Sequence, residues 1–189
     1  MSPAQNDVDW YEVVHGDELM QCDLLASCPV PRVRGFEEWP ISETQPVEVE
    51  VYFEDLIILS QSCDLANDKI QDVILAQVLN WKNAREELVR QGNLFARSKQ
   101  FRRALIAGNI PSLSLLHKRD DPPELEWSVV DFHRIFVLAK PVVAAVANSA
   151  GQRWRLRSPY RESLAQAFAR YFMRVGLPLD AKAFEVEDA

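Results

Sequence analysis

A run of four aliphatic residues, Leu56-Ile57-Ile58-Leu59, ends abruptly in a cluster of polar residues, and this boundary constrains the fold more than any other segment. Short apolar runs that contain β-branched residues are typical of buried strands, so we expect a strand over residues 56–60. Polar side chains at the end of a rigid buried strand favour a functional site. The alternative is an ordinary turn in which Asp64 bonds its own backbone. The polar cluster consists of Ser60, Gln61, Ser62, Cys63 and Asp64.

The remaining apolar patterns predict an α+β fold. Val47, Val49 and Val51 alternate with glutamates, which is typical of a strand with one wet face. Four prolines in residues 29–46 each remove a backbone donor, so a long ordered loop is expected there. Further apolar runs and alternations predict strands at residues 73–79, 127–132, 134–138 and 153–157.

Three segments have the spacing or end signals of helices. In residues 81–107, apolar residues recur on one face, Gly92-Asn93 divides the segment and Gly108 ends it. Pro141 is suited to begin a short helix over residues 141–147. The last helix has Ser158 as its cap and Pro159 at its first position. Its apolar stripe consists of Leu164, Phe168, Tyr171, Phe172 and Val175.

The net charge of −7 conceals a strong segregation of charge along the chain. Residues 1–55 carry thirteen acidic and two basic side chains, whereas residues 82–103 carry seven basic and two acidic ones. On the predicted strand 153–157, Trp154 and Leu156 are expected to face inward and three arginines outward. Like charges in a row repel, so either nucleic-acid phosphate or the chain's own acidic half would relieve the repulsion. These arginines are Arg153, Arg155 and Arg157.

Several protein classes are disfavoured. No apolar stretch approaches the ~20 residues that span a bilayer, so we expect no membrane association. The N-terminal residues lack the basic start and apolar core of a signal peptide, which favours a cytoplasmic location. Three cysteines do not make a disulfide framework, and the spacing of Cys22 and Cys28 exceeds that of a usual zinc knuckle. We therefore expect free thiols, no metal and no cofactor.

Two further chemistries depend on contacts that the sequence does not fix. As a nucleophile, Cys63 needs a base within hydrogen-bond reach, and the possible bases are His15, His117 and His133. Asp131 and His133 share one face of a predicted strand, where they either serve in proton transfer or lock the strand. The candidate catalytic residues are thus Cys63, Asp64 and His133, and the candidate nucleic-acid contacts are Arg134, Arg153, Arg155 and Arg157.

Six motifs follow one another along the chain: Gly16-Asp17, Leu59-Ser60, Val129–Ile135, Gly151, Arg155-Leu156 and the helix over residues 159–175. This order resembles that of the MazF/PemK-like toxins of bacterial toxin–antitoxin systems. The resemblance implies a single domain over residues 1–189, with a small SH3-like β-barrel, a helical insertion at residues 81–108 and a C-terminal amphipathic helix. It also implies a possible homodimer and, in active members, a metal-independent endoribonuclease that acts in bacterial stress or phage defence.

The sequence departs from this family at both catalytic positions. Gln45 precedes Pro46 where the family has an arginine, and Asn80 stands where the family has Thr or Ser. Two functions therefore remain open. The first is an RNA-binding protein or endoribonuclease that uses the arginines. The second is a catalytically silent module that binds a protein partner, an antitoxin or regulator, through residues 81–108 and the acidic residues 37–55.

Overall fold

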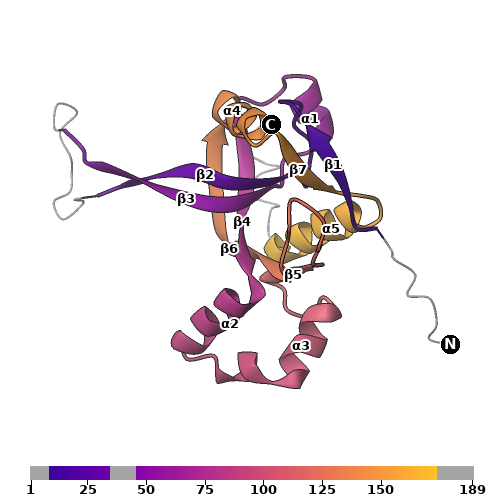
Figure 1. Cartoon of the computed structure of the whole chain (residues 1–189). Helices are drawn as coiled ribbons and strands as arrows, with labels where there is room; N and C mark the ends of the chain where they lie inside the picture. The colour runs from indigo at the N-terminus through magenta and orange to yellow at the C-terminus, as the bar shows by residue number, and fades with distance from the viewer. Residues whose placement is uncertain (1–8, 35–45, 174–189) are drawn as a thin grey trace, which may run out of the picture.

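The computed structural model describes residues 9–34 and 46–173. Within these ranges the chain forms seven strands in two sheets, five α-helices and one 3₁₀-helix (Figure 1), so the predicted α+β class is confirmed. No helix in the described part is long and apolar enough to cross a membrane. The strands are β1 (Tyr11–His15), β2 (Leu24–Val33), β3 (Val49–Ile58), β4 (Asp72–Asn80), β5 (Leu113–Leu116), β6 (Ser128–Ala139) and β7 (Gln152–Leu156). The helices are α1 (Ser62–Ala66), α2 (Trp81–Arg90), η1 (Leu94–Arg97), α3 (Lys99–Ile106), α4 (Lys140–Ser149) and α5 (Tyr160–Phe172).

The larger sheet has the order β2-β3-β4-β6-β5, and all neighbouring strands are antiparallel. Its centre consists of the apolar runs that the sequence predicts as strands, because the end of β3 pairs with β4 over Leu56–Ile58 and is fully buried. The strands expected at residues 47–51 and 56–60 are parts of one strand, since the intervening residues continue the pairing with β2. In the same way β6 joins the two strands expected at residues 127–138.

The course of β2 corrects the first part of the prediction of a loop over residues 29–46, because residues 29–33 belong to a strand. Pro29 and Pro31 lie within β2 and pair with Phe53 and Val51 of β3. Because β2 is an edge strand, it has no second neighbour that would need the missing proline donors. Residues 49–54 of β3 pair with β2 alone, so the two strands extend from the body as a ribbon (Figure 1). Residues 35–45 lie outside the described ranges.

The smaller sheet consists of β1 and β7, which pair from Tyr11 with Leu156 to His15 with Gln152. The end of β7 also meets the beginning of β2. Arg155 forms an isolated bridge with Asp23, and the backbone N–H of Leu156 donates to the carbonyl of Cys22 at 3.2 Å. The two sheets thus approach at one corner, but the described strands do not form a closed barrel.

Three apolar clusters hold these elements together. The first lies between the sheets and α5 and contains Phe132 and Trp154. The second lies beneath α4, where Val143 packs against residues of β3 and β4. In the third, Phe101 and Leu105 of α3 pack with residues of α2, β5 and β6. The helices α2, η1 and α3, which we call the insertion after the segment predicted at residues 81–108, therefore have a small core of their own at one end of the sheet (Figure 1).

Local capping explains where the inserted helices begin. The side chain of Asn80 accepts from Lys82 N at 2.8 Å, and that of Ser98 accepts from Phe101 N at 3.0 Å. Leu94 has the spacing of the apolar face expected in residues 81–107, but its side chain is 67% exposed. The reason is that η1 is a separate turn and a new helix begins after Ser98. Together α2, η1 and α3 cover residues 81–106 of the segment that was expected to be helical.

The terminal helix differs from its prediction at both ends. Ser158 makes no side-chain cap, and α5 begins at Tyr160 after Pro159. Leu164 is buried, whereas Phe172 at the end of the helix is exposed. The remaining member of the predicted stripe, residue 175, lies outside the described ranges.

Candidate nucleic-acid interface

A bulge interrupts β6 where it pairs with β4. Ala76 of β4 pairs with Ile135, but the adjacent Gln77 pairs with Asp131, so three residues of β6 have no partner on β4. Bulges of this kind redirect side chains and are common beside functional sites. The three residues are Phe132, which is buried, His133, which is exposed, and Arg134, which is partly exposed.

A polar network surrounds this bulge. Asp131 Oδ1 accepts from the backbone N–H of His133 at 2.9 Å and lies 3.4 Å from its Nδ1. Arg134 Nη1 donates to Gln77 Oε1 at 3.0 Å. The same guanidinium lies 3.7 Å from Asp131 and 3.6 Å from Glu87 of α2. Asp131 therefore fixes the backbone of the bulge, while the imidazole remains exposed and linked to a carboxylate.

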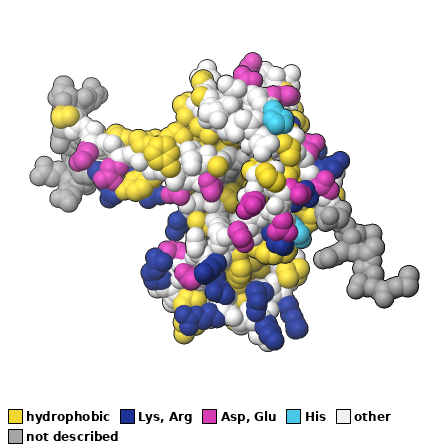
Figure 2. Space-filling model, viewed as in Figure 1, with side chains coloured by type: hydrophobic (Ala, Val, Ile, Leu, Met, Phe, Trp, Pro, Cys, Tyr) yellow, Lys and Arg dark blue, Asp and Glu magenta, His cyan; other side chains and the backbone are white. Residues whose placement is uncertain are grey.

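The inserted helices beside this network carry a group of unpaired cations (Figure 2). Figure 2 shows dark-blue Lys and Arg side chains gathered over the region that Figure 1 labels α2 and α3. Among residues 82–103, Arg90 pairs with Glu87 at 2.8 Å. The other basic side chains of the insertion make no ion pair or hydrogen bond to any described residue. They are Lys82, Arg85, Arg97, Lys99, Arg102 and Arg103, which we call the basic patch.

Two hollows connect the basic patch with the bulge. A cavity of about 650 Å³ is lined by Arg85, Glu86, Val89, Arg90 and Arg97. A smaller one, of about 180 Å³, shares Glu86 and Arg90 with the first and reaches Arg134 on β6. Arg134, a predicted nucleic-acid contact, thus lies next to the insertion, whereas the basic patch itself was not among the predicted site residues. The signal that could have identified it is the positive charge of residues 82–103.

The arginines of β7 correct a prediction. Arg153 and Arg155 were expected to point outward, but they are only 3% and 7% exposed. Asp23 lies between them with no exposure, and its Oδ2 is 3.1 Å from Arg153 Nε and 3.0 Å from Arg155 Nη2. The structure therefore agrees with the second of the two expected arrangements, in which the chain's own acidic half neutralises these arginines. The physical reason is that the segment leading to Asp23 covers β7, and the carbonyls of Gly16 and Glu18 accept from the two guanidinium groups.

The buried contact keeps Arg155 charged. Burial by itself would lower the pKa of Arg155, but the hydrogen bonds and the charge of Asp23 outweigh burial and raise this pKa above its usual value. Arg157, the third arginine, is exposed and pairs with Asp9 at 3.3 Å. Of the three arginines expected to contact nucleic acid on the strand predicted at residues 153–157, only Arg157, which follows β7, is thus available to a ligand at the surface.

The polar cluster after β3 forms a strand-to-helix connection. Ser60 Oγ accepts from Ile74 N at 2.9 Å, and Ser62 Oγ accepts from Gln21 N at 3.0 Å. These bonds attach the end of β3 to β4 and to the segment before β2. Gln61 Oε1 lies 3.6 Å from the Sγ of Cys63. The two serines therefore have structural partners, and the exposed Cys63 is the reactive group that remains.

No hydrogen bond joins Cys63 to an imidazole in the described part of the chain. His15 contacts the carbonyl of Gly151 at 2.9 Å, His117 that of Lys118 at 2.8 Å, and His133 is linked to Asp131. Asp64 Oδ1 lies 3.7 Å from Cys63 Sγ. The thiol and base that a cysteine hydrolase requires are therefore not brought together.

The other two thiols are buried. Burial raises the pKa of Cys22 and that of Cys28 to about 12, so both are protonated at neutral pH. All three cysteines are free. Among the described residues, no group of three or more Cys, His, Asp or Glu side chains is arranged to hold a metal ion.

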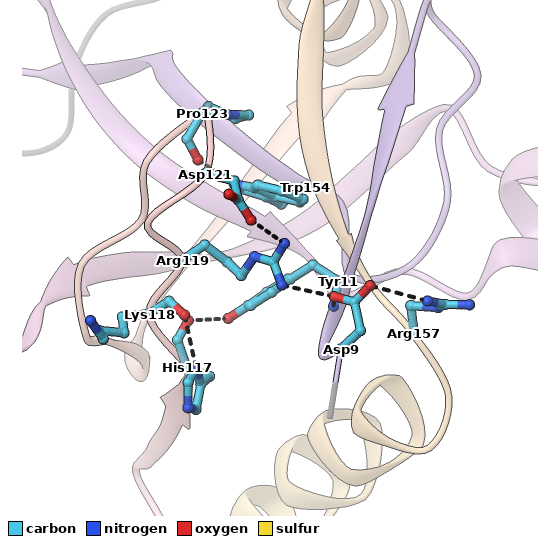
Figure 3. Close-up of polar contacts among 9 residues, drawn as sticks. All are labelled: Asp9, Tyr11, His117, Lys118, Arg119, Asp121, Pro123, Trp154 and Arg157. Carbon is cyan, nitrogen blue, oxygen red and sulfur yellow. Dashed lines mark hydrogen bonds and ion pairs between the residues drawn. The ribbon is translucent and has the colours of Figure 1, made fainter. Parts of the chain in front are cut away.

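A second polar cluster, shown in Figure 3, has an internal structural role. Arg119 pairs with Asp9 at 3.0 Å and with Asp121 at 2.7 Å, and its guanidinium lies 5.1 Å from the centre of the Trp154 ring. The hydroxyl of Tyr11 donates to the carbonyl of His117 at 2.8 Å, and burial raises the pKa of this hydroxyl. These contacts attach the loop before β6 to β1 and β7, and they compensate the charge of Arg119.

Comparison with known proteins yields no family assignment: no protein-family model and no curated protein sequence matches the chain.

Proposed function

We propose that the chain is a MazF/PemK-like protein that binds RNA through its helical insertion. The observation that supports this most directly is the distribution of ion pairs. Twelve described Lys and Arg side chains pair with a carboxylate, and eleven of these lie outside residues 82–103. The seven without a partner are the six of the basic patch and Arg170 on α5, which lies close to Gly108 at the end of the insertion.

An anionic polymer suits this arrangement better than the chain's own carboxylates. The protein has a net charge of −7, so acidic side chains are abundant, yet the six cations of the basic patch pair with none of the described ones. Phosphate groups spaced along a strand would neutralise several of them together and release counterions. An SH3-like arrangement is part of the proposal, and the approach of β7 to both β1 and β2 supports it.

Salt dependence tests this proposal. If all six cations contact phosphates of a single strand, the logarithm of the affinity falls with the logarithm of the salt concentration with a slope of about −4. We expect the double variant Arg102→Ala/Arg103→Ala to reduce this slope by about 1.4. The measurement is fluorescence anisotropy of a labelled RNA of mixed sequence between about 50 and 200 mM salt.

The matched control is Arg32→Ala/Arg34→Ala, which removes the same charge from paired positions on β2 and its continuation. This control should retain the slope of the unmodified protein. A weak slope in the unmodified protein, or an equal loss in both double variants, would contradict the proposal.

The bulge extends the proposal from binding to cleavage. Exposed His133, supported by Asp131, would accept the proton of an RNA 2′-hydroxyl. The oxygen would attack the adjacent phosphorus, the 5′-oxygen would leave with a proton from water, and Arg134 would stabilise the charge on the phosphate. This step needs no metal, as in active members of the family. His133→Ala should abolish cleavage and retain binding, with His15→Ala as the control; cleavage that survives in His133→Ala would exclude this role.

One observation favours the alternative function, a module that binds a protein partner. One face of the β2–β3 ribbon is apolar and mostly exposed, and Figure 2 shows hydrophobic side chains in yellow over much of the ribbon. Phe53 is 69% exposed on this face, whereas Glu50 and Tyr52 on the other face bond to Arg34. The apolar face consists of Pro29, Pro31, Val33, Val49, Val51 and Phe53.

Site-specific cross-linking distinguishes this alternative. A photoreactive residue at position 53 should capture a discrete protein in cells if the ribbon is an interface. The same residue at position 50, on the polar face, is the control. Equal or absent capture at both positions would count against a protein-binding ribbon.

A further inference from the structure

A pocket lined by two tryptophans lies between the insertion and the sheet. Its volume is about 270 Å³, and its walls come from α2, α3, β5 and the residue before β6. Trp81 and Trp127 supply aromatic surface, and Arg102 of the basic patch supplies a positive charge. The remaining lining is aliphatic and consists of Leu105, Ile106 and Leu115.

The aromatic walls are held in place by neighbouring groups. The backbone N–H of Trp81 donates to the carbonyl of Trp127 at 2.7 Å, which joins the two tryptophan positions directly. Phe101 lies nearly parallel to Trp81, with ring centres 6.1 Å apart. The ring of His117 lies 4.4 Å from that of Trp127. Because the rings are already supported, a ligand would not need to order them, and this favours binding.

The wall of the pocket is almost entirely apolar, and Arg102 at its edge makes no ion pair with a described residue. A ligand that fits this arrangement combines a flat ring with a nearby negative charge. A nucleotide has both features, because its base stacks on aromatic side chains and its phosphate pairs with arginine.

We propose that this Trp81–Trp127 pocket binds one unpaired base of an RNA strand whose phosphates lie on the basic patch. This inference rests on the proposed RNA binding and adds to it a base-binding pocket between the insertion and the sheet. Bases in a duplex are stacked and paired, so they cannot enter a side pocket, whereas those of single strands can turn outward. The volume of the pocket lies below the range of about 300–1,000 Å³ that is common for drug-sized ligands, which agrees with a single base.

An abasic strand separates the contribution of the base from that of phosphate. We expect a single-stranded RNA to bind at least about tenfold more tightly than an abasic strand of equal length and charge. Duplex RNA of the same length should lose this advantage as well. The measurement is a titration by anisotropy at constant salt, accompanied by quenching of tryptophan fluorescence.

Variants of the pocket should remove the preference for bases and leave the salt dependence unchanged. Trp127→Ala is the first variant, and Ile106→Glu is the second, because Ile106 is 72% exposed and its substitution does not threaten folding. Both should bind single-stranded RNA no better than the abasic strand. Phe95→Ala removes an exposed aromatic of the insertion outside the pocket and should retain the preference.

The outcomes distinguish the two proposals. Equal affinity of the unmodified protein for intact and abasic strands, with a steep salt dependence, would overturn the base pocket and leave RNA binding intact. A preference for bases that persists in both pocket variants would also overturn it. Absence of salt-dependent binding to any RNA would overturn the proposed function together with the pocket.

Discussion

The buried contact between Asp23 and the arginines of β7 predicts a large loss of stability when its charge is removed. Asp23→Asn preserves the shape of the side chain but leaves two guanidinium groups without a counter-charge at positions 3% and 7% exposed. Removing one partner of a buried ion pair costs about 3–5 kcal/mol, because the remaining charge stays desolvated. The charge on Arg153 and Arg155 cannot reach solvent without displacing the segment that contains Gly16 and Glu18.

Urea denaturation at neutral pH measures this loss as the change in the free energy of unfolding. At about 2–4 °C for each kcal/mol in a protein of this size, the melting temperature should fall by about 10 °C. Asp9→Asn is the control, since Asp9 also pairs with two arginines, Arg119 and Arg157, but lies at the surface. Its cost should stay below about 1 kcal/mol. An equally small cost for Asp23→Asn would refute the conclusion that the β7 arginines are neutralised internally.

Three further predictions follow from burial and capping. In the native protein, Cys63 should react with a thiol reagent at pH 8 while Cys22 and Cys28 should not, because their pKa of about 12 leaves almost no thiolate. The measurement is the number of reacted thiols per chain, which should be one in the native protein and three after unfolding. Phe101→Ala should cost about 3–5 kcal/mol in urea denaturation, since Phe101 is buried in the core of the insertion. Ser98→Ala should cost about 1 kcal/mol by loss of the α3 cap, and a cost near zero would show that the Ser98–Phe101 bond contributes nothing.

Local patterns predicted the elements of this fold well where one face is buried. The run over residues 73–79 lies within β4, and the helical spacing of residues 81–107 corresponds to α2, η1 and α3. The prolines of residues 29–46 gave a wrong expectation, because their effect depends on whether the strand has a second neighbour. That property of β2 is set by the order of the sheet and not by the sequence of the strand.

The site was less predictable because its contacts are distant in sequence. Arg155 and Asp23 are 132 residues apart, and alternation on β7 gave no sign that both of its faces would be covered. The bulge at His133 arises from a shift in pairing between β4 and β6, which periodicity does not encode. Only the excess of positive charge in residues 82–103 indicated the basic patch in advance.

The pairing of charges explains why one basic segment remains free and the other does not. The acidic N-terminal part of the chain is close to β7, where Asp23 neutralises both arginines of the strand and Asp9 pairs with Arg157 just after it. Two glutamates of β3 pair with Arg32 near the end of β2 and with Arg34 just beyond it. The insertion lies at the far end of β4 from α1 and has one partly buried carboxylate, Glu87, which pairs with Arg90 and Arg134. Among residues 9–34 and 46–173, the Lys and Arg side chains are therefore paired everywhere except on the insertion and at the adjoining Arg170, and this distribution is the basis on which we propose an external polyanion as the ligand.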